Sequence, residues 1–358
     1  MFSNNHGVSN IASAVWIGLT DSVKSNYVLV TGATGLIGAH VVDRLLKRGC
    51  RVRMAVRSKE KADFFASSRP GYRSQLDFFF IKDLADDGVF NGAVDSGINS
   101  VIHVASPLRY DLENNEEALI KPAILGVRSI LQACFHSQVR RIVLTSSFAA
   151  VLNLPLPETL PRTYTAKDWN PITYAEAVAP SASSVEAYRG SKTFAEQEAW
   201  KFMASESPSF DLVTLCPPLV FGPLATPPKS LASDLNESNK FLWKILSGTE
   251  LPLSTFNFWI DVRDLAEIHV QALMKPSVGG KRYVPVSNEL FTYNMAAEII
   301  KEELPPLSDK IPTGDQPVRP YIRVDLEPLE KDIPEIHYTP FRETVVDFAR
   351  QFEPFLGR

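Results

Sequence analysis

The sequence predicts an α/β protein with a doubly wound parallel sheet and a smaller, discontinuous C-terminal lobe. Two observations lead to this prediction. Short apolar runs rich in β-branched residues alternate with segments whose apolar residues recur at helical spacing, from residue 27 to residue 215. The first run is followed at once by a turn with three regularly spaced glycines and then by a helical pattern. That order of strand, tight turn and helix is typical of the first unit of such a sheet.

The glycine turn after the first predicted strand, 27–30, is the strongest local signal in the chain. Gly32, Gly35 and Gly38 stand three residues apart. Glycine adopts backbone conformations closed to other residues and lets the chain approach a ligand closely. The helix that starts in the turn directs free N–H groups and its positive dipole end towards an anion. An ordinary βα turn needs no ligand, but the flanking strand and amphipathic helix favour a dinucleotide site.

Basic residues follow the second predicted strand, 51–56. In a nicotinamide-dinucleotide unit this position contacts the adenosine ribose, where an acid selects NAD and an arginine accommodates the 2′-phosphate of NADP. No acid stands there, whereas Arg57 and Lys61 do, with Arg53 as a third candidate. The planar fork of arginine suits a phosphate. A solvated basic helix start would look the same, but the pattern favours NADP(H) as the cofactor.

The third and fourth predicted strands bring further cofactor contacts to the same edge of the sheet. Asp83 follows the third strand and could reach the adenine amino group. Ala105 and Ser106 follow the fourth strand and could pass against the pyrophosphate and ribose. His103 lies inside that apolar strand, so we interpret it as a core histidine and not as a catalyst.

The third to sixth strands of the sheet are predicted at 76–81, 101–104, 141–147 and 210–215. Helices are predicted at 117–135 and 187–200.

The chain is expected to divide into three parts. Residues 1–25 form an N-terminal extension. Residues 26–216 form the NADP-binding domain, with an excursion over 152–185 that lines the cleft. Residues 217–358 form mainly the substrate-binding lobe, from which 256–274 return to the first domain. Within the lobe, 224–238 is a candidate lid, a strand is predicted at 256–260, and helices are predicted at 240–246, 262–274, 294–303 and 341–352.

Tyr188 and Lys192 are four residues apart on a predicted helix, so their side chains project from the same face. Ser147 stands at the carboxyl end of the fifth strand, where a doubly wound sheet places its ligands. Reducing a carbonyl by hydride leaves negative charge on oxygen, which must be stabilised and protonated. We interpret Tyr188 as the proton donor, Lys192 as the cation that lowers the phenol's pKa and holds the nicotinamide ribose, and Ser147 as the hydroxyl that orients the carbonyl. Ser146 is a close competitor, and a strand-end cap and a solvated lysine are the plainer alternatives.

The composition argues against several other classes of function. A formal net charge of −4 gives no electrostatic reason to expect nucleic acid or an acidic membrane as partner. Three scattered cysteines show no metal-ligand spacing and indicate reduced thiols in the cytoplasm. The apolar stretch 11–19 has no basic leader and is too short to span a bilayer. We expect a small-molecule carbonyl substrate, no metal, and a monomer or homodimer.

Taken together, these residues resemble the extended short-chain dehydrogenase/reductase superfamily. The Thr-Gly-x-x-Gly-x-x-Gly turn, the Thr-Ser-Ser strand end and the Tyr-x-x-x-Lys helix are the motifs on which the resemblance depends. Within the superfamily the sequence is most similar to the dihydroflavonol reductase-like branch, particularly fungal methylglyoxal, aldehyde and ketone reductases. The supporting stretches are 57–61, 103–107, 141–150, 168–171, 188–192, 217–223 and 260–266.

The resemblance implies NADPH, the catalytic residues Ser147, Tyr188 and Lys192, and a C-terminal lobe that closes over the substrate. In such proteins the second serine of the pair is the catalytic one, which favours Ser147 over Ser146. The N-terminal extension departs from the family, because many relatives begin almost at the first strand. The expected cofactor contacts are Gly32, Thr34, Gly35, Leu36, Ile37, Gly38, Arg57, Lys61, Asp83, Leu84, Ala105, Ser106, Tyr188, Lys192, Pro217 and Val220.

The sequence leaves the substrate open. Phe148, Tyr174 and Phe221 could line an aromatic pocket, which would suit a bulky hydrophobic carbonyl better than a sugar. A substrate of specialised metabolism fits this expectation. Aromatic residues more often fill a core than a pocket. A nucleotide-sugar epimerase or dehydratase is an alternative, although it would favour an acid after the second strand. A non-catalytic NADP-sensing regulator is another, although it would usually lack the Tyr-x-x-x-Lys pair.

Overall fold

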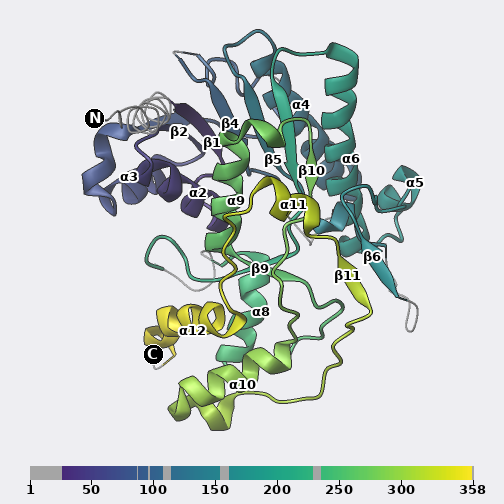
Figure 1. Cartoon of the computed structure of the whole chain (residues 1–358). Helices are drawn as coiled ribbons and strands as arrows, with labels where there is room; N and C mark the ends of the chain where they lie inside the picture. Colours follow the sequence, from purple (N-terminus) through teal and green to yellow (C-terminus); the bar gives the residue numbers. More distant parts are fainter. Residues whose placement is uncertain are drawn as a thin grey trace, which may run out of the picture.

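The computed structural model of the chain describes residues 26–86, 88–95, 97–107, 114–153, 161–228 and 235–356. In this part of the chain the main sheet has seven strands in the order β10-β7-β5-β4-β1-β2-β3, and every neighbouring pair is parallel. The predicted doubly wound parallel sheet is therefore confirmed (Figure 1). Its strands are β1 (Tyr27–Thr31), β2 (Arg51–Val56), β3 (Leu76–Phe80), β4 (Ser100–His103), β5 (Arg141–Thr145), β7 (Asp211–Leu215) and β10 (Arg282–Tyr283).

Helices cover both faces of this sheet, as parallel strands require. The helices on one face are α2 (Leu36–Lys47), α3 (Lys59–Ser67) and α9 (Val262–Met274). The helices on the other face are α4 (Lys121–Phe135) and α6 (Ser184–Glu206). A π-helical turn, Glu116–Ile120, leads directly into α4, so the predicted helix 117–135 is present with an irregular first turn.

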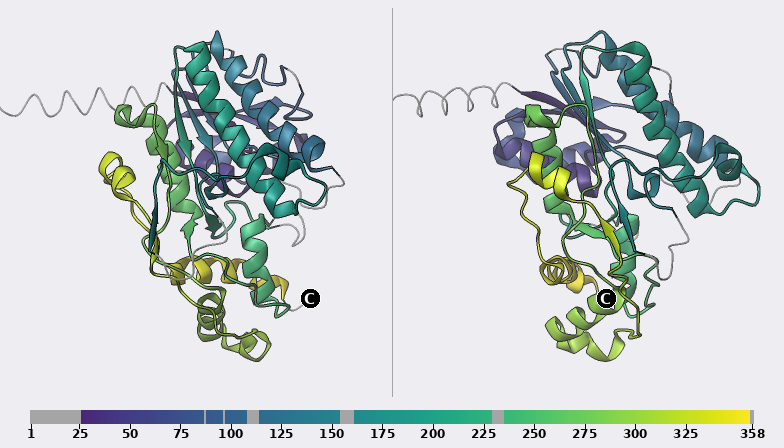
Figure 2. Two further views of the ribbon diagram at one scale, coloured as in Figure 1. Left: turned by 90° about the vertical axis from the view of Figure 1, so that its right-hand side faces the viewer. Right: turned by 45° about the vertical axis from the view of Figure 1, so that its right-hand side comes forward.

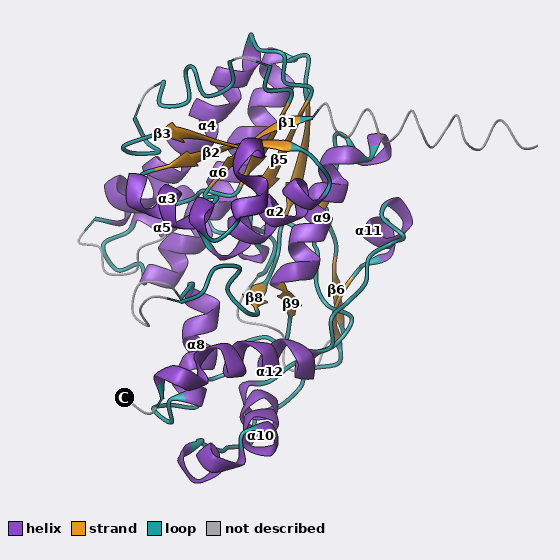
Figure 3. Cartoon of the chain, turned by 90° about the vertical axis from the view of Figure 1, so that its left-hand side faces the viewer, coloured by secondary structure: helices purple, strands orange, loops and turns teal. Residues whose placement is uncertain are grey.

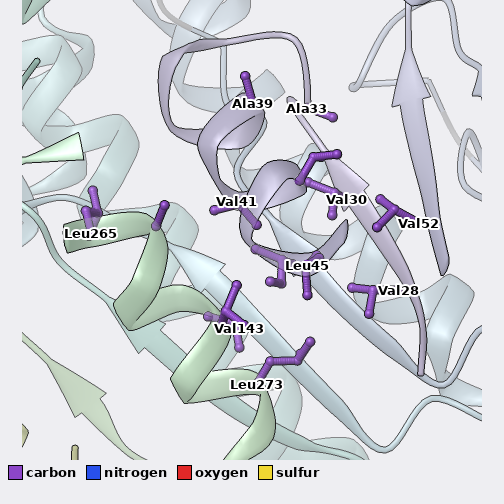
Figure 4. Packing of buried hydrophobic residues seen from close by; sticks show 14 of the residues in the cluster. Val28, Val30, Ala33, Ala39, Val41, Leu45, Val52, Val143, Leu265 and Leu273 are labelled. Carbon is purple, nitrogen blue, oxygen red and sulfur yellow. The ribbon is translucent and has the colours of Figure 1, made fainter. Parts of the chain in front are cut away.

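Side chains that alternate along β1 show how the two layers are filled. Val28 and Val30 belong to the hydrophobic cluster of α2 and α9, whereas Leu29 belongs to the cluster of α4 and α6. Figure 4 shows the first cluster, in which Leu45 of α2 and Leu273 of α9 lie over the strands. Helix α9, which is far from α2 in sequence, thereby packs beside α2 on the same face of the main sheet.

The direction of winding reverses between β1 and β4, which are neighbours in the sheet. Thr31, the last residue of β1, pairs in register with His103, the last residue of β4. Both strands therefore end side by side, with the glycine turn following one and Ala105 following the other. Open α/β sheets bind ligands at such a switch point.

A second group of elements lies below the main sheet in Figure 1. In Figure 3 a two-stranded parallel sheet, β8 with β9, lies between α9 and the helices α8 and α12. Both views in Figure 2 show α10 and α12 together at the end of the molecule away from the main sheet. The elements are β8 (Leu219–Phe221), β9 (Trp259–Asp261), α8 (Glu237–Leu246), α10 (Tyr293–Glu303) and α12 (Phe341–Phe352).

The remaining elements are short. Strand β6 (Arg162–Tyr164) pairs in parallel with β11 (Ile322–Val324), so the excursion after residue 152 meets the C-terminal part of the chain. Two short helices are α5 (Tyr174–Val178) and α11 (Glu327–Asp332). Short 3-10 helices of one or two turns cover Pro70–Gln75, Phe148–Ala150, Pro276–Val278, Pro305–Lys310 and Glu353–Phe355.

Strands shorter than four residues were missed or misplaced by the sequence pattern. The predicted strand 256–260 is wrong in its bounds, because Asn257 pairs with Phe291 through its backbone and its side-chain amide, and the strand begins at Trp259. Strands β6, β8, β10 and β11 were not predicted. Of the candidate lid 224–238, residues 229–234 lie outside the described residues, and residues 237 and 238 already belong to α8.

We propose that residues 26–216 form the cofactor domain and 217–358 mainly the substrate lobe, with 256–274 returning. The shared cluster of α9 and α2 supports this division. Strand β10 belongs with the first domain as well, because it extends the main sheet beside β7.

One described helical segment, Glu116–Phe135, has the length and apolar content of a membrane span, with a mean hydropathy of 1.4. Half of that segment is buried inside the protein. It packs against α6 over the sheet, as the core helix of an α/β domain does.

Candidate active site

Two glycines of the turn are required by close packing at the switch point. Gly32 has a φ of +65°, and a Cβ there would lie 2.8 Å from the backbone nitrogen of Ala105. A Cβ on Gly38 would overlap the carbonyl oxygen of Gly32. The turn is thus pressed against the chain that leaves β4, and larger residues at these two positions are excluded.

The third glycine faces open space. Gly35 is exposed and is the N-cap of α2. Because glycine has no side chain, it offers no side-chain acceptor to the first N–H groups of this helix. A Cβ there would meet only the Gly32 carbonyl oxygen, at 3.4 Å. The first N–H groups of α2, at Leu36 and Ile37, begin a helix whose N-terminus is uncapped, and such a terminus fits an anion. The turn therefore fits the diphosphate of a dinucleotide.

The basic residues after β2 differ in their availability. Arg57 and Lys61 are exposed at the start of α3, and neither side chain forms an ion pair with a described residue. Ser58 caps this helix by accepting from the Lys61 backbone N–H over 3.4 Å. Arg53, the third candidate, is engaged with Asp77 at 2.8 Å and with backbone carbonyls. These bonds argue against Arg53 as a phosphate ligand, whereas the exposed Arg57 and Lys61 fit a 2′-phosphate.

A small cavity with a mixed polar and apolar lining lies at the carboxyl ends of β4 and β5. Its volume is about 20 Å³, which is room for one water molecule. The predicted cofactor contacts Leu84, Ala105, Ser106 and Lys192 all line it, together with Glu196. The structure thus brings these four predicted residues to one place.

Three predicted contacts lie elsewhere along this edge. Asp83 is exposed, and its carboxylate accepts from the Ala85 backbone N–H over 3.0 Å. Val220 has a buried side chain, its backbone N–H donates to the Ser238 hydroxyl, and its carbonyl oxygen accepts from the Asn236 amide, both over 3.3 Å. The Pro217 carbonyl oxygen accepts from the Phe148 N–H over 2.8 Å.

His103 is a core histidine, as the sequence indicated. Its Nδ1 lies 2.9 Å from the Thr31 hydroxyl, and burial together with the charge of Lys192 lowers its pKa to about 3. The ring is therefore neutral at physiological pH, and the Thr31 hydroxyl also accepts from the Ala105 N–H over 3.1 Å. This arrangement holds the ends of β1 and β4 together.

The two serines at the end of β5 point in different directions. The Tyr188 hydroxyl donates to Ser147 Oγ over 3.4 Å, while Ser147 Oγ also accepts from the Ala149 N–H over 3.1 Å. Ser146 instead donates to Glu196 over 2.7 Å. Lys192 lies one helical turn beyond Tyr188, with its ammonium 5.9 Å from the centre of the phenol ring. Ser147, Tyr188 and Lys192, which come from two separate elements, therefore lie close together. They lie at the edge of the sheet at which the strands end and the glycine turn begins.

Residues 28–285 match the NAD dependent epimerase/dehydratase family. The chain belongs to this family. It is 32% identical over 345 residues to the NADPH-dependent methylglyoxal reductase GRE2 of Saccharomyces cerevisiae, covering 92% of this chain and 99% of that protein. It is 34% identical over 299 residues to the ketoreductase azaE of Aspergillus niger, covering 81% and 86%. The resemblance to extended short-chain reductases of the fungal methylglyoxal reductase type is thereby confirmed.

A solved relative shares the whole architecture. The yeast methylglyoxal/isovaleraldehyde reductase Gre2 complexed with NADPH superposes with a TM-score of 0.85 at 31% identity, covering 93% of this chain and 99% of that one. The chain is accordingly an NADPH-dependent oxidoreductase that reduces carbonyl compounds. Its glycine turn and its free basic residues fit that cofactor.

The pKa of the phenol in this reductase differs from the sequence expectation. Enclosure raises the pKa of Tyr188 above its ordinary value, and the hydrogen bond with Ser147 opposes this only in part. Burial, which penalises the charged phenolate, therefore sets the direction of the shift, and not the charge of Lys192 as the sequence suggested. Burial also lowers the pKa of Lys192 to about 8, against the opposing influence of Cys216 and Glu196. The phenol is therefore protonated at neutral pH and the lysine still mostly charged.

The predicted aromatic substrate contacts are mostly core residues of the reductase. Phe148 is 1% exposed and packs against Tyr164 and Phe258, and Phe221 is 0% exposed and packs against Phe291. Their burial argues against the pocket role assigned from the sequence. Tyr174 is 38% exposed, and its hydroxyl donates to Glu116 over 3.0 Å. Of the three, only Tyr174 presents its ring to the surface.

Sequence reasoning missed a buried charged pair next to the site. Glu196, one helical turn beyond Lys192, is 1% exposed and is paired with Arg282 of β10. The spacing of Tyr188, Lys192 and Glu196 at intervals of four was a signal that could have found the carboxylate. Arg282 carried no such signal, because a strand of two residues is too short to show an alternating pattern in the sequence. Among the described residues, no group of three or more His, Cys, Asp or Glu side chains gathers to hold a metal.

Proposed function

We propose that this reductase converts an aldehyde or ketone with an apolar substituent into the alcohol, with Tyr188 as the proton donor. In this proposal Ser147 donates a hydrogen bond to the carbonyl oxygen, and Lys192 supplies positive charge and holds the nicotinamide ribose. The observation that supports it is the 3.4 Å separation of the Ser147 and Tyr188 hydroxyl oxygens. Two donors at that distance can both hydrogen-bond a single carbonyl oxygen.

Bound NADPH supplies the hydride that reduces the carbonyl carbon. The protein's own residues deal with the oxygen. As negative charge develops there, the Ser147 hydroxyl stabilises it and the Tyr188 phenol gives up its proton to it. The raised pKa of Tyr188 ensures that the proton is present before the reaction. One hydride and one proton thus enter the carbonyl group, and an alcohol results.

Lys192 has its role after this proton transfer. The phenolate left on Tyr188 would be costly in an enclosed site, and an ammonium one helical turn away reduces that cost. With its pKa of about 8, Lys192 is mostly protonated at neutral pH. The lysine is therefore suited to stabilise the tyrosinate until a proton from solvent restores the phenol.

The cofactor would be held along the edge of the sheet from the glycine turn to the β5 end. Arg57 and Lys61 would bind the 2′-phosphate, and the first turn of α2 would bind the diphosphate. Arg57 and Lys61 are exposed and form no ion pair with a described residue, and the N-terminus of α2 has no side-chain cap, which supports these assignments. The other assigned contacts are Gly32, Thr34, Leu36, Ile37, Asp83, Leu84, Ala105, Ser106, Pro217 and Val220.

The substrate class is proposed from the relatives' activities. Those relatives are named for methylglyoxal, isovaleraldehyde and ketones. We therefore propose aldehydes and ketones with an apolar substituent as substrates. Of Phe148, Tyr174 and Phe221, Tyr174 is the exposed candidate for contact with that substituent.

The test is to follow NADPH absorbance with a panel of aldehydes and ketones that differ in their apolar substituent. We expect consumption of NADPH and one alcohol per NADPH oxidised. Binding of NADPH without its consumption by any carbonyl would favour a regulator. Conversion of a nucleotide sugar at constant NADPH absorbance would favour an epimerase, and either result would overturn the proposal.

A further inference from the structure

A buried polar network lies immediately behind the proposed catalytic residues. Its centre is the carboxylate of Glu196, which accepts from Ser146 Oγ over 2.7 Å and from Arg282 Nε over 2.8 Å. The Cys216 thiol lies 3.4 Å from the same carboxylate. We call Ser146, Glu196, Cys216 and Arg282 the Glu196 network.

The network joins the two elements that carry the proposed catalytic residues. Glu196 lies on α6, two helical turns beyond Tyr188 and one beyond Lys192. Ser146 lies at the end of β5, next to Ser147. The Ser146–Glu196 hydrogen bond therefore connects the backbone next to Ser147 directly to the helix of Tyr188. A rotation of either element that broke this bond would also change the separation of Ser147 and Tyr188.

Arg282 extends the connection to the turn that follows Ser147. Its guanidinium donates to the carbonyl oxygens of Ala166 and Ala150, at 2.9 and 3.3 Å, and lies 3.9 Å from the centre of the Trp169 ring. Ala150 ends the 3-10 turn for which Ser147 is the N-cap. The ion pair with Glu196 thus holds the far end of that turn as well.

Electrostatics connect the network to Lys192. Lys192, Glu196 and His103 all line the same cavity of about 20 Å³. The titratable groups that act on or face Lys192 are His103 from β4, Cys216 next to the end of β7, and Tyr188 and Glu196 from α6. Arg282 from β10 is paired with Glu196. Of these, Glu196 is a carboxylate, and its negative charge favours the ammonium form of Lys192.

We propose that Glu196 is a positioning residue for carbonyl reduction: through Ser146 it holds Ser147 at the Tyr188 hydroxyl, and through its charge it keeps Lys192 protonated. The inference rests on the proposed function of these three residues. It assigns no contact with substrate or cofactor to Glu196. The first effect requires an acceptor oxygen at this place, between β5, α6 and β10, and the second requires the negative charge.

The two effects can be separated by two variants of the full-length protein. Ser146→Ala removes the hydrogen bond and leaves the ion pair, so we expect kcat to fall about tenfold at an unchanged pH profile and an unchanged Kd for NADPH, in line with the loss of one aligned contact. Glu196→Gln keeps an acceptor for Ser146 but removes the charge. We expect the alkaline limb of kcat/KM to move about one pH unit lower, because one nearby opposite charge is lost.

Binding supplies a readout that does not depend on turnover. Fluorescence titration with NADPH across pH should show affinity declining as Lys192 loses its proton, and that decline should begin at lower pH in Glu196→Gln. Glu198→Gln is the matched control. Glu198 lies on the same helix but pairs with Arg128 of α4 at 3.1 Å, so its removal should leave the pH profile unmoved. Ser129→Ala is the control for Ser146→Ala, because it removes a buried serine hydroxyl that has no hydrogen-bond partner among the described residues.

The outcomes distinguish this inference from the function on which it rests. The positioning role alone would be overturned if Ser146→Ala and Glu196→Gln both kept the wild-type kcat and pH profile. Ser147→Ala and Tyr188→Phe would be inactive in that case. Full turnover by Tyr188→Phe would overturn the proposed function. If Glu196→Gln fails to fold because Arg282 is left unpaired, Ser146→Ala decides, and an unchanged kcat in that variant refutes the inference.

Discussion

The hydroxyl of Tyr188 donates to Ser147 Oγ over 3.4 Å, although the two residues belong to different elements and are 41 positions apart. Ser147 begins the turn after β5, and Tyr188 lies in the second turn of α6. The contact lies at the edge of the sheet that holds the carboxyl ends of β1, β4 and β5. The proposed chemistry depends on this separation.

Removing the phenol oxygen of Tyr188 should lower the rate of carbonyl reduction and leave NADPH binding unchanged. We expect Tyr188→Phe to lower kcat by about 10²–10⁴-fold, the usual worth of a positioned proton donor. Stopped-flow or steady-state NADPH oxidation measures the rate, and fluorescence titration measures the Kd for NADPH, which should stay near that of the wild type. Tyr164→Phe is the control, since its hydroxyl donates to the Asn153 carbonyl oxygen and not to Ser147. A Tyr188→Phe enzyme with normal turnover would exclude the phenol as donor.

Reversing the charge at Arg57 should change cofactor preference. Arg57→Glu is expected to weaken NADPH binding by about 10- to 100-fold, the range for a lost hydrogen bond to a charged group, with far less effect on NADH. Isothermal titration with both cofactors measures the ratio. Arg140→Glu makes the same charge change at an exposed residue before β5, at the opposite edge of the sheet, and should leave the ratio unchanged. Equal weakening of NADPH and NADH would contradict a 2′-phosphate contact.

The glycine turn provides a test that separates packing from binding. Gly35→Ala meets only an ordinary contact at 3.4 Å, so the melting temperature without NADPH should hardly change. Affinity for NADPH should nevertheless fall, because the added methyl group fills the space in front of the uncapped end of α2. Gly38→Ala, which overlaps the Gly32 carbonyl oxygen, should lower both stability and affinity. If Gly35→Ala bound NADPH like the wild type, the diphosphate would not lie at that position.

Lys192 should make activity and stability respond to pH in opposite ways. Its pKa is lowered from 10.5 to about 8, so the ammonium is present below pH 8 and is lost as pH rises through that value; kcat/KM should fall there. Between pH 8 and 10.5 the unfolded chain binds more protons than the folded one, so this residue's contribution to stability improves with rising pH. Lys192→Met should therefore be inactive and yet melt a few degrees higher than the wild type at pH 7.

Calorimetry without NADPH at several pH values checks this prediction. The gain in melting temperature of Lys192→Met should shrink as pH approaches 10, because the wild-type lysine is then neutral as well. A variant that melts lower than the wild type at pH 7 would show that the ammonium is stabilised by its surroundings.

The buried ring of Phe221 should matter for stability. Phe221→Ala is expected to lower the free energy of unfolding by about 3–5 kcal/mol, because it empties a site packed against Phe291 and its aromatic neighbours. Tyr174→Ala, at an exposed ring, should cost much less stability, and any change in KM for an apolar carbonyl would appear there instead. Urea unfolding and KM values for the substrate panel measure both. A Phe221→Ala protein that is as stable as the wild type but has a raised KM would contradict the core role. It would support Phe221 as a substrate contact.

Local sequence pattern was sufficient for much of the fold and part of the site. Strand β2 and helices α9 and α12 have the predicted bounds, because their apolar periodicity is long and regular. The glycine turn could be recognised for the same reason, since its strand, glycines and helix are contiguous. Tyr188 and Lys192 share a helix face through their spacing alone.

Contacts between distant segments were decided only in three dimensions. Ser146 and Ser147 are adjacent in sequence, and nothing local says which one turns towards Tyr188 and which towards Glu196. Arg282 belongs to a two-residue strand whose place beside β7 follows from sheet pairing and not from any pattern of its own. The aromatic residues Phe148 and Phe221 look the same in a core as in a pocket until their neighbours are known. Periodicity reports which face of an element is apolar, whereas the partners of that face depend on how elements far apart in the chain pack together.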